Sequence, residues 1–181
     1  MSVDLFSKNY FEIFETPVIY DIDIKNISHI FLQLQKAVHP DRFAHGSDQE
    51  KRIAMQQTSL INQAFQTLKE PVSRAQYMLK LQGIDMDSET DTTMDAEFLM
   101  EQMEFRESIV EVQDKPDPLS ALDVMSKTLG QKMSALMMSF ASSYEAASYK
   151  DARELVRKMQ FIIKAQKEVD DLSEKLEDEL I

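Results

Sequence analysis

The chain has 181 residues, of which 43% are hydrophobic, and its 32 acidic against 20 basic side chains give a formal net charge of −12. This acidity argues against nucleic-acid binding, which needs a basic surface, and the absence of cysteine excludes disulfides, thiolate zinc sites, cysteine catalysis and self-ligated iron–sulfur clusters. Since no apolar run approaches the roughly 18 residues of a membrane span, and the N-terminus lacks the basic start and apolar core of a secretory signal, we expect a soluble, cytoplasmic protein.

The first two predicted helices lie before residue 39. A short helix is expected over about 9–14. A second is expected over Ile24–Val38, because its apolar residues recur at steps of three and four and Asp23 is suited to cap its first turn. Pro40 disfavours helical backbone at His39, so this helix must end there.

The next two helices follow a short connection. Ser47 and Glu50 form the pattern of a capping box, in which each side chain satisfies a backbone amide of the other, so a helix is expected from there to about 69. Pro71 predicts the start of a fourth helix, to about 81, because proline at the first helical position loses no hydrogen bond. The apolar residues expected to face the core from the second and third helices are Ile27, Ile30, Phe31, Leu34, Val38, Ile53, Leu60, Ile61, Ala64, Phe65 and Leu68.

A change in composition follows the fourth helix. Up to Lys80 the 9 basic residues balance 9 acidic ones, whereas the 11 basic and 23 acidic residues that follow carry the whole net charge. The stretch Gly83–Met94 is rich in short polar side chains, which compete with helix formation. We therefore predict two domains, 1–82 and 95–181, joined by a linker over 83–94.

Three longer helices are predicted in the second domain. The first spans about 95–112. The second begins after Asp117 and Pro118, an N-cap followed by a first-turn proline, and the third spans about 149–180. The residues expected to face inward from the last two helices are Leu122, Met125, Leu129, Met133, Leu136, Phe140, Tyr144, Leu155, Met159, Ile162, Val169, Leu172, Leu176 and Leu180. Amphipathic helices of this kind bury one another as a three-helix bundle, so the whole chain is predicted to be all-α.

The tripeptide His39-Pro40-Asp41 is the sharpest local feature of the sequence. It lies between two long predicted helices, in a loop that proline stiffens. Such a loop presents an imidazole and a carboxylate at the end of a helical hairpin, which suits recognition of a partner. An isolated tripeptide of this kind is more often a simple polar turn, so the interpretation depends on the surrounding sequence.

That surrounding sequence favours recognition. The order and spacing of four segments resemble the J domain, the four-helix module of co-chaperones that stimulate the ATPase of seventy-kilodalton heat-shock chaperones. The four segments are Asn9-Tyr-Phe-Glu-Ile-Phe14, His39-Pro-Asp-Arg-Phe43, Ile61-Asn-Gln-Ala-Phe-Gln-Thr-Leu68 and Pro71-Val-Ser-Arg-Ala-Gln-Tyr77.

Longer segments narrow the resemblance to the HscB family, small J-type co-chaperones dedicated to iron–sulfur cluster assembly. These segments are Val38-His-Pro-Asp-Arg-Phe-Ala-His-Gly-Ser47, Ser59-Leu-Ile-Asn-Gln-Ala-Phe-Gln-Thr-Leu68, Ser73-Arg-Ala-Gln-Tyr-Met-Leu79 and Phe98-Leu-Met-Glu-Gln-Met-Glu-Phe-Arg-Glu107. The similarity covers roughly 9–107 and resumes around 153–176. A general J protein instead continues into a Gly/Phe-rich segment and cysteine-based zinc modules, which this sequence lacks. The resemblance implies a J domain attached to a three-helix bundle.

The resemblance also implies that the J domain docks on a dedicated HscA-type ATPase chaperone and triggers ATP hydrolysis through the tripeptide. The residues expected to form this docking surface are His39, Pro40, Asp41, Lys25, Lys36, Arg42 and Phe43. The chain departs from general J domains where Leu32, Gln33 and Ala37 occupy positions that are often basic. Charge-steered docking should therefore be weak, which favours a specialised chaperone over a general one.

The predicted helix over 95–112 carries two apolar stripes. One comprises Phe98, Phe105, Ile109 and Val112, and the other, about 120° away around the helix, comprises Leu99, Met103 and Val110. A bundle helix can bury two stripes against two neighbours, or the second stripe can be an exposed patch bordered by carboxylates, a common form of partner surface. The resemblance implies the exposed patch, as a binding site for an IscU-type iron–sulfur scaffold. The matching positions are Leu99, Met100, Met103, Glu104, Glu107 and, on the last helix, Phe161.

Two other interpretations of the sequence are weaker. His39, Asp41 and His45 could form a metal site or an acid–base pair, but three potential ligands on one loop without a fourth are usually coincidental. We therefore expect no catalytic residue, metal or cofactor.

The bundle could bind unfolded clients in place of a folded scaffold, as in a general J-domain co-chaperone. Competition between a folded scaffold and an unfolded polypeptide distinguishes the two binding functions.

Overall fold

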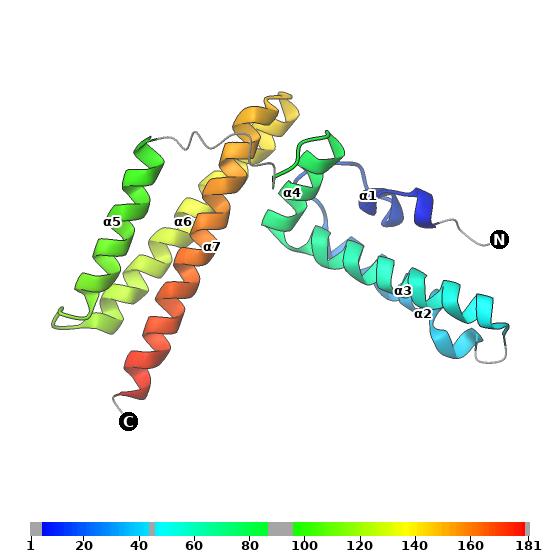
Figure 1. Cartoon of the computed structure of the whole chain (residues 1–181), viewed down its shortest axis with the longest axis horizontal. Helices are drawn as coiled ribbons and strands as arrows, with labels where there is room; N and C mark the ends of the chain where they lie inside the picture. Colours follow the sequence, from blue (N-terminus) through cyan, green and yellow to red (C-terminus); the bar gives the residue numbers. More distant parts are fainter. Residues whose placement is uncertain (1–4, 44–45, 87–95, 180–181) are drawn as a thin grey trace. The chain divides into compact units, whose positions relative to one another are not determined.

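The fold is entirely helical in the part of the chain that the structure describes, residues 5–43, 46–86 and 96–179. In this computed structural model the chain divides into two compact units, Met1–Leu81 and Gln82–Ile181 (Figure 1). The predicted all-α architecture, a helical hairpin with short flanking helices and then a three-helix bundle, is confirmed. The predicted linker, 83–94, lies mostly outside the described residues, so its bounds stay a prediction.

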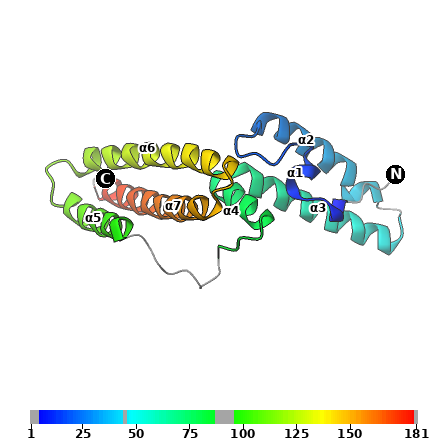
Figure 2. The ribbon, with the colours of Figure 1, turned by 90° about the horizontal axis from the view of Figure 1, so that it is seen from above.

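The N-terminal unit is built on an antiparallel hairpin of α2 and α3, which run side by side in both views (Figures 1 and 2). Helices α1 and α4 and the 3-10 turns η1 and η2 all pack against α3, which therefore organises the unit. The elements are η1 Leu5–Ser7, α1 Tyr10–Ile13, α2 Ile24–Val38, η2 Pro40–Phe43, α3 Asp48–Lys69 and α4 Pro71–Leu81.

Capping side chains set the starts of α2 and α3, as the sequence predicts. The Asp23 carboxylate accepts hydrogen bonds from the amides of Lys25 and Asn26 at 3.0 and 3.1 Å. The Ser47 amide donates to the Glu50 carboxylate at 2.8 Å, and the Glu50 amide donates to the Ser47 hydroxyl at 3.3 Å. The hydrogen bonds from the Ser47 amide and hydroxyl favour the charged carboxylate and lower the pKa of Glu50.

Aromatic pairs hold the N-terminal unit together. The ring of Phe31 on α2 stacks on Phe65 of α3, with ring centroids 4.0 Å apart. Tyr10 of α1 stacks on Tyr77 of α4 at 4.2 Å, and the Tyr10 amide donates a 3.0 Å hydrogen bond to the Tyr77 hydroxyl. Such pairs add to the free energy of simple burial. Together they tie α2 to α3 and α1 to α4.

Arg74 of α4 is a buried cation with a structural role. Its guanidinium donates a 2.6 Å hydrogen bond to the carbonyl of Leu68 and lies 4.8 Å from the centroid of the Tyr20 ring. Burial lowers the pKa of Arg74 and raises the pKa of Tyr20. The side chain therefore joins α4 to the end of α3 and to the loop before α2.

One core residue is wrongly predicted in α3. Ile53 was expected to face inward, but 37% of its surface is exposed, whereas the adjacent Ala54 is buried. Ala54 precedes the buried Ile61 by seven residues, which is close to two helical turns, and so shares its face. Ile53 has the same relation to the partly buried Leu60 and lies on the flank of the helix.

The C-terminal unit is a bundle of α5 Ala96–Val112, α6 Pro118–Glu145 and α7 Tyr149–Asp178. Asp117 caps α6 through a 3.1 Å hydrogen bond from the Ser120 amide, and Pro118 occupies the first turn, as predicted. Helices α6 and α7 make the most extensive contact, whereas α5 touches each of them over a shorter stretch (Figure 2). Within the described residues, no helix is both long and apolar enough to cross a membrane.

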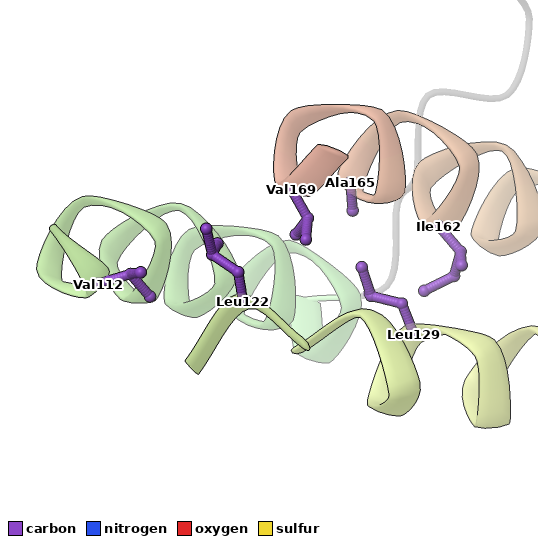
Figure 3. Packing of buried hydrophobic residues seen from close by; sticks show 6 residues of the cluster. All are labelled: Val112, Leu122, Leu129, Ile162, Ala165 and Val169. Atoms are coloured by element: carbon purple, nitrogen blue, oxygen red, sulfur yellow. The ribbon is translucent and has the colours of Figure 1, made fainter. Parts of the chain in front are cut away.

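The bundle core draws on all three helices. Figure 3 shows Val112 of α5, Leu122 and Leu129 of α6, and three residues of α7 converging between the helices. The buried residues of this cluster are Val112, Leu122, Leu129, Ile162, Ala165 and Val169. The first apolar stripe of α5 faces this core, since Phe98 and Val112 are buried and Phe105 and Ile109 are partly buried against it.

Candidate partner-binding sites

The tripeptide lies in a loop whose backbone is hydrogen-bonded to α3 and within itself. Helix α2 ends at Val38, whose carbonyl accepts a 3.4 Å hydrogen bond from the Thr58 hydroxyl of α3. The loop then turns through η2, where the Arg42 amide donates to the His39 carbonyl at 3.0 Å. These bonds fix the direction in which the loop leaves the hairpin.

The side chains of His39 and Asp41 face solvent from this loop, with 58% and 90% of their surfaces exposed. The Asp41 amide donates a 3.3 Å hydrogen bond to His39 Nδ1, and the Asp41 carboxylate lies 3.5 Å from the same nitrogen. Both contacts are made at Nδ1, and Nε2 has no hydrogen-bond partner among the described residues. The Nε2 edge of the ring is therefore open to a partner. The sequence had also placed His45 in a weak metal-site hypothesis, and that residue lies outside the described part of the chain.

The rest of the predicted chaperone surface carries few charges. Lys25 and Lys36 are exposed on α2, and the Arg42 guanidinium makes long contacts of 3.4 and 3.5 Å with the carbonyls of Lys36 and Ala37. Leu32, which stands where general J domains are often basic, is 55% exposed. Phe43 is partly buried, and for Pro40 the structure describes only the backbone. This surface is therefore weakly basic and partly apolar.

The second apolar stripe of α5 is exposed. Leu99 has 44% of its surface accessible to solvent, Met103 62% and Val110 66%, and Met100, further round the helix, also has 62%. Glu104 and Glu107 are exposed on the same helix. A bundle of only three helices covers α5 on one side, so the alternative in which both stripes are buried does not hold. An apolar patch next to carboxylates remains available to a partner.

Phe161 does not share the exposure of that stripe. Its ring packs edge-on against Phe98 and Phe105 of α5, with centroids 5.6 and 5.7 Å away, and it is partly buried. It lies between α5 and α7, where it lines clefts on both sides of α5. A partner can reach Phe161 through either cleft, so its predicted binding role depends on those openings.

The cleft between α5 and α7 is a feature that the sequence reasoning missed. It has a volume of about 470 Å³, and its lining includes three basic residues and one acidic one, Arg106, Arg157, Lys164 and Glu168. Arg157 is also paired with Glu154 at 2.8 Å. The sequence could not signal this cationic cluster, because its members come from two helices within a strongly acidic half of the chain.

Comparisons with known proteins all match one family. Residues 94–170 match the family model described as the HSCB C-terminal oligomerisation domain. The co-chaperone protein HscB homolog of Shewanella loihica is 41% identical over 165 residues, covering 90% of this chain and 95% of its own. The solved structure of the chaperone HscB from Vibrio cholerae superposes with a TM-score of 0.83 at 37% identity, covering 96% of this chain and all of that one. The human co-chaperone protein HscB superposes with a TM-score of 0.81 at 29% identity, covering 91% and 81%.

Proposed function

The chain belongs to the HscB family of co-chaperones, and from that premise we propose that it stimulates the ATPase of an HscA-type chaperone and delivers an IscU-type iron–sulfur scaffold to it. The N-terminal unit, a J domain, contacts the chaperone. The bundle holds the scaffold during cluster assembly or transfer. The protein acts by binding, and the covalent chemistry belongs to its partners.

The tripeptide loop supports the chaperone half of this proposal. His39 and Asp41 are exposed on a loop anchored to α2 and α3, so they contribute little to the core of the N-terminal unit. A fixed loop loses little conformational entropy on binding, which favours its use as a contact. The imidazole of His39 and the carboxylate of Asp41 supply hydrogen-bonding groups for a complementary site on the ATPase.

The exposed stripe of α5 supports the scaffold half. Leu99, Met100 and Met103 leave a continuous helical face of flexible apolar side chains in water, which a folded partner can cover. Glu104 and Glu107 beside it favour a partner with basic residues and raise the association rate. This exposure of an apolar, carboxylate-bordered stripe is the observation that carries the proposal.

The proposal is tested with a purified HscA-type chaperone and IscU-type scaffold. The wild-type chain should bind the scaffold and raise the ATPase rate, and the two proteins together should raise that rate more than either alone. An unfolded polypeptide should not displace the scaffold from the bundle. Displacement by the unfolded chain, with no preference for the scaffold, would instead support the alternative of a general co-chaperone for unfolded clients.

A further inference from the structure

A second cleft opens beside α5, on the side of α6. Its volume is about 310 Å³, and its floor is apolar, formed by Phe105 of α5, Met125 and Leu129 of α6, and Phe161 of α7. Val124 of α6 stands at its edge with 60% of its surface exposed. The cleft lies where α5 and α6 meet over a short stretch, whereas α6 and α7 are in extensive contact.

The hydroxyl groups in this cleft are already hydrogen-bonded within their own helices. The Ser108 hydroxyl donates to the Phe105 carbonyl at 2.8 Å, and the Thr128 hydroxyl donates to the Val124 carbonyl at 2.9 Å. Neither therefore needs an acceptor from a ligand. A volume of this size is at the lower end of the range of about 300–1,000 Å³ for small-molecule pockets. The cleft suits one or two apolar side chains better than a cofactor.

The rim of the cleft carries an excess of negative charge. Glu101 and Glu104 of α5 and Lys132 of α6 line it, and Lys132 forms an ion pair with Glu101. Glu104 is left exposed without a salt bridge among the described residues. An occupant that places a basic residue at the rim and an apolar one inside is complementary to the cleft.

We propose that the α5–α6 cleft is part of the scaffold-binding surface, with α6 supplying Val124 and Thr128 to a site otherwise attributed to α5 and Phe161. The occupant is an apolar side chain of the scaffold with a basic residue next to it. This inference rests on the proposed function. The cleft adjoins the predicted scaffold-binding residues, because two of them, Glu104 of α5 and Phe161 of α7, line it.

The apolar part of the proposal is tested by Val124→Gln, a neutral change at an exposed helical position. Met138→Gln is the matched control, because Met138 is 68% exposed on the same helix and does not line the cleft. Scaffold affinity of the full chain is measured by calorimetry, beside thermal unfolding. Loss of an apolar anchor should weaken affinity about tenfold for Val124→Gln. Met138→Gln should bind as the wild type does, and neither variant should unfold earlier.

The electrostatic part is tested by Lys132→Ala against Lys127→Ala. Lys127 also lies on α6 and pairs with a carboxylate, that of Asp123, but it does not line the cleft. Both variants lower the net charge of the chain by one. Only Lys132→Ala makes the rim more negative, so at low salt its association rate with the scaffold should rise about twofold or more above that of Lys127→Ala.

The outcomes separate this inference from the proposed function. If Met103→Ala weakens scaffold binding while Val124→Gln and Lys132→Ala match their controls, the cleft is not part of the site and the inference fails while the proposed function stands. If the wild-type chain does not bind the scaffold, the proposed function fails and the inference fails with it. Weaker binding by Val124→Gln, with Met138→Gln unchanged, supports the inference.

Discussion

In the N-terminal unit the candidate site is a run of consecutive residues, His39–Phe43, held by backbone hydrogen bonds at the end of a hairpin. In the bundle the candidate site is an exposed helical stripe with clefts on either side, formed by three helices. The first depends on polar groups at fixed positions, and the second on apolar area that adapts to a partner. The comparison indicates that the two candidate sites are built differently, and that substitutions should affect them separately.

The largest expected effect comes from His39→Gln in the loop. The side chain is more than half exposed and its ring makes no core contact among the described interactions, so the fold should be unchanged. Stimulation of the chaperone ATPase should be abolished, because glutamine does not reproduce the shape and hydrogen-bonding groups of the imidazole ring. Steady-state ATP hydrolysis checks this, with unfolding temperature and scaffold affinity as controls. Full stimulation by a folded His39→Gln protein contradicts the assignment.

The next effect is expected from Leu99→Ala combined with Met103→Ala on α5. Because both side chains are exposed, stability should barely change, while scaffold affinity should fall by more than about 1–2 kcal/mol per anchor. Met159→Ala is the matched control, since Met159 is fully buried and its truncation should cost about 2–5 kcal/mol of stability. Its affinity per folded molecule should not change. A large loss of stability in the double variant, with unchanged affinity, would assign the stripe to the core.

Phe161→Ala tests the point where the core and the proposed surface meet. Loss of its edge-on contacts with two rings should lower stability by about 2–4 kcal/mol. It should also weaken scaffold binding, because Phe161 lines both clefts. A double-mutant cycle with Met103→Ala measures the coupling, which should exceed about 0.5 kcal/mol if both contact one partner. Simple additivity of the two losses would indicate that Phe161 and Met103 do not contact one partner as a coupled surface.

A smaller effect is expected at the turn between α6 and α7. Ala147 adopts a left-handed backbone conformation with φ of 55°, which disfavours a residue with a Cβ atom. Ala147→Gly should therefore raise the stability of the bundle by up to about 1 kcal/mol, partly offset by the greater entropy of glycine in the unfolded chain. The unfolding midpoint in urea checks this prediction. A lower midpoint would mean that the alanine side chain makes a compensating contact.

The smallest effect concerns the capping box that closes the loop after the tripeptide. Hydrogen bonds from Ser47 lower the pKa of Glu50 in the folded state. The stability that the ionised carboxylate contributes to the fold is therefore fully present above the ordinary pKa of a glutamate. That contribution is lost as the pH falls through the lower pKa of the folded state. The difference in unfolding temperature between wild type and Glu50→Gln should therefore be largest near neutral pH and shrink in acid. A difference that grows in acid would contradict this sign.

Much of the helical architecture is predictable from local signals. Asp23, Ser47 with Glu50, and Asp117 begin helices where the sequence indicates, because a cap depends only on neighbours within one turn. Asn9 and Glu12 form a further capping box at α1, which the sequence reasoning passed over although its spacing is the same. Local hydrogen bonding is therefore the part of the fold that is best encoded in short segments.

Burial and clefts were less predictable, because they depend on which helices meet. Periodicity gave α5 two apolar stripes but could not say which would be covered, and only the packing of three helices leaves Met103 exposed. The same packing places Phe161 between α5 and α7 and opens a cleft at Val124. Ile53 was wrongly placed in the core, because it lies 100° around α3 from the buried Ala54, on the flank of the helix.

The most direct test of the two-surface account is ATP hydrolysis by the HscA-type chaperone, measured with and without the IscU-type scaffold, for His39→Gln and for Leu99→Ala/Met103→Ala. The stripe variant should stimulate the chaperone like the wild type when scaffold is absent and lose the additional stimulation when scaffold is present. His39→Gln should fail in both conditions while binding scaffold with wild-type affinity. If both folded variants lose both activities together, the two units do not carry separate sites and the account is wrong.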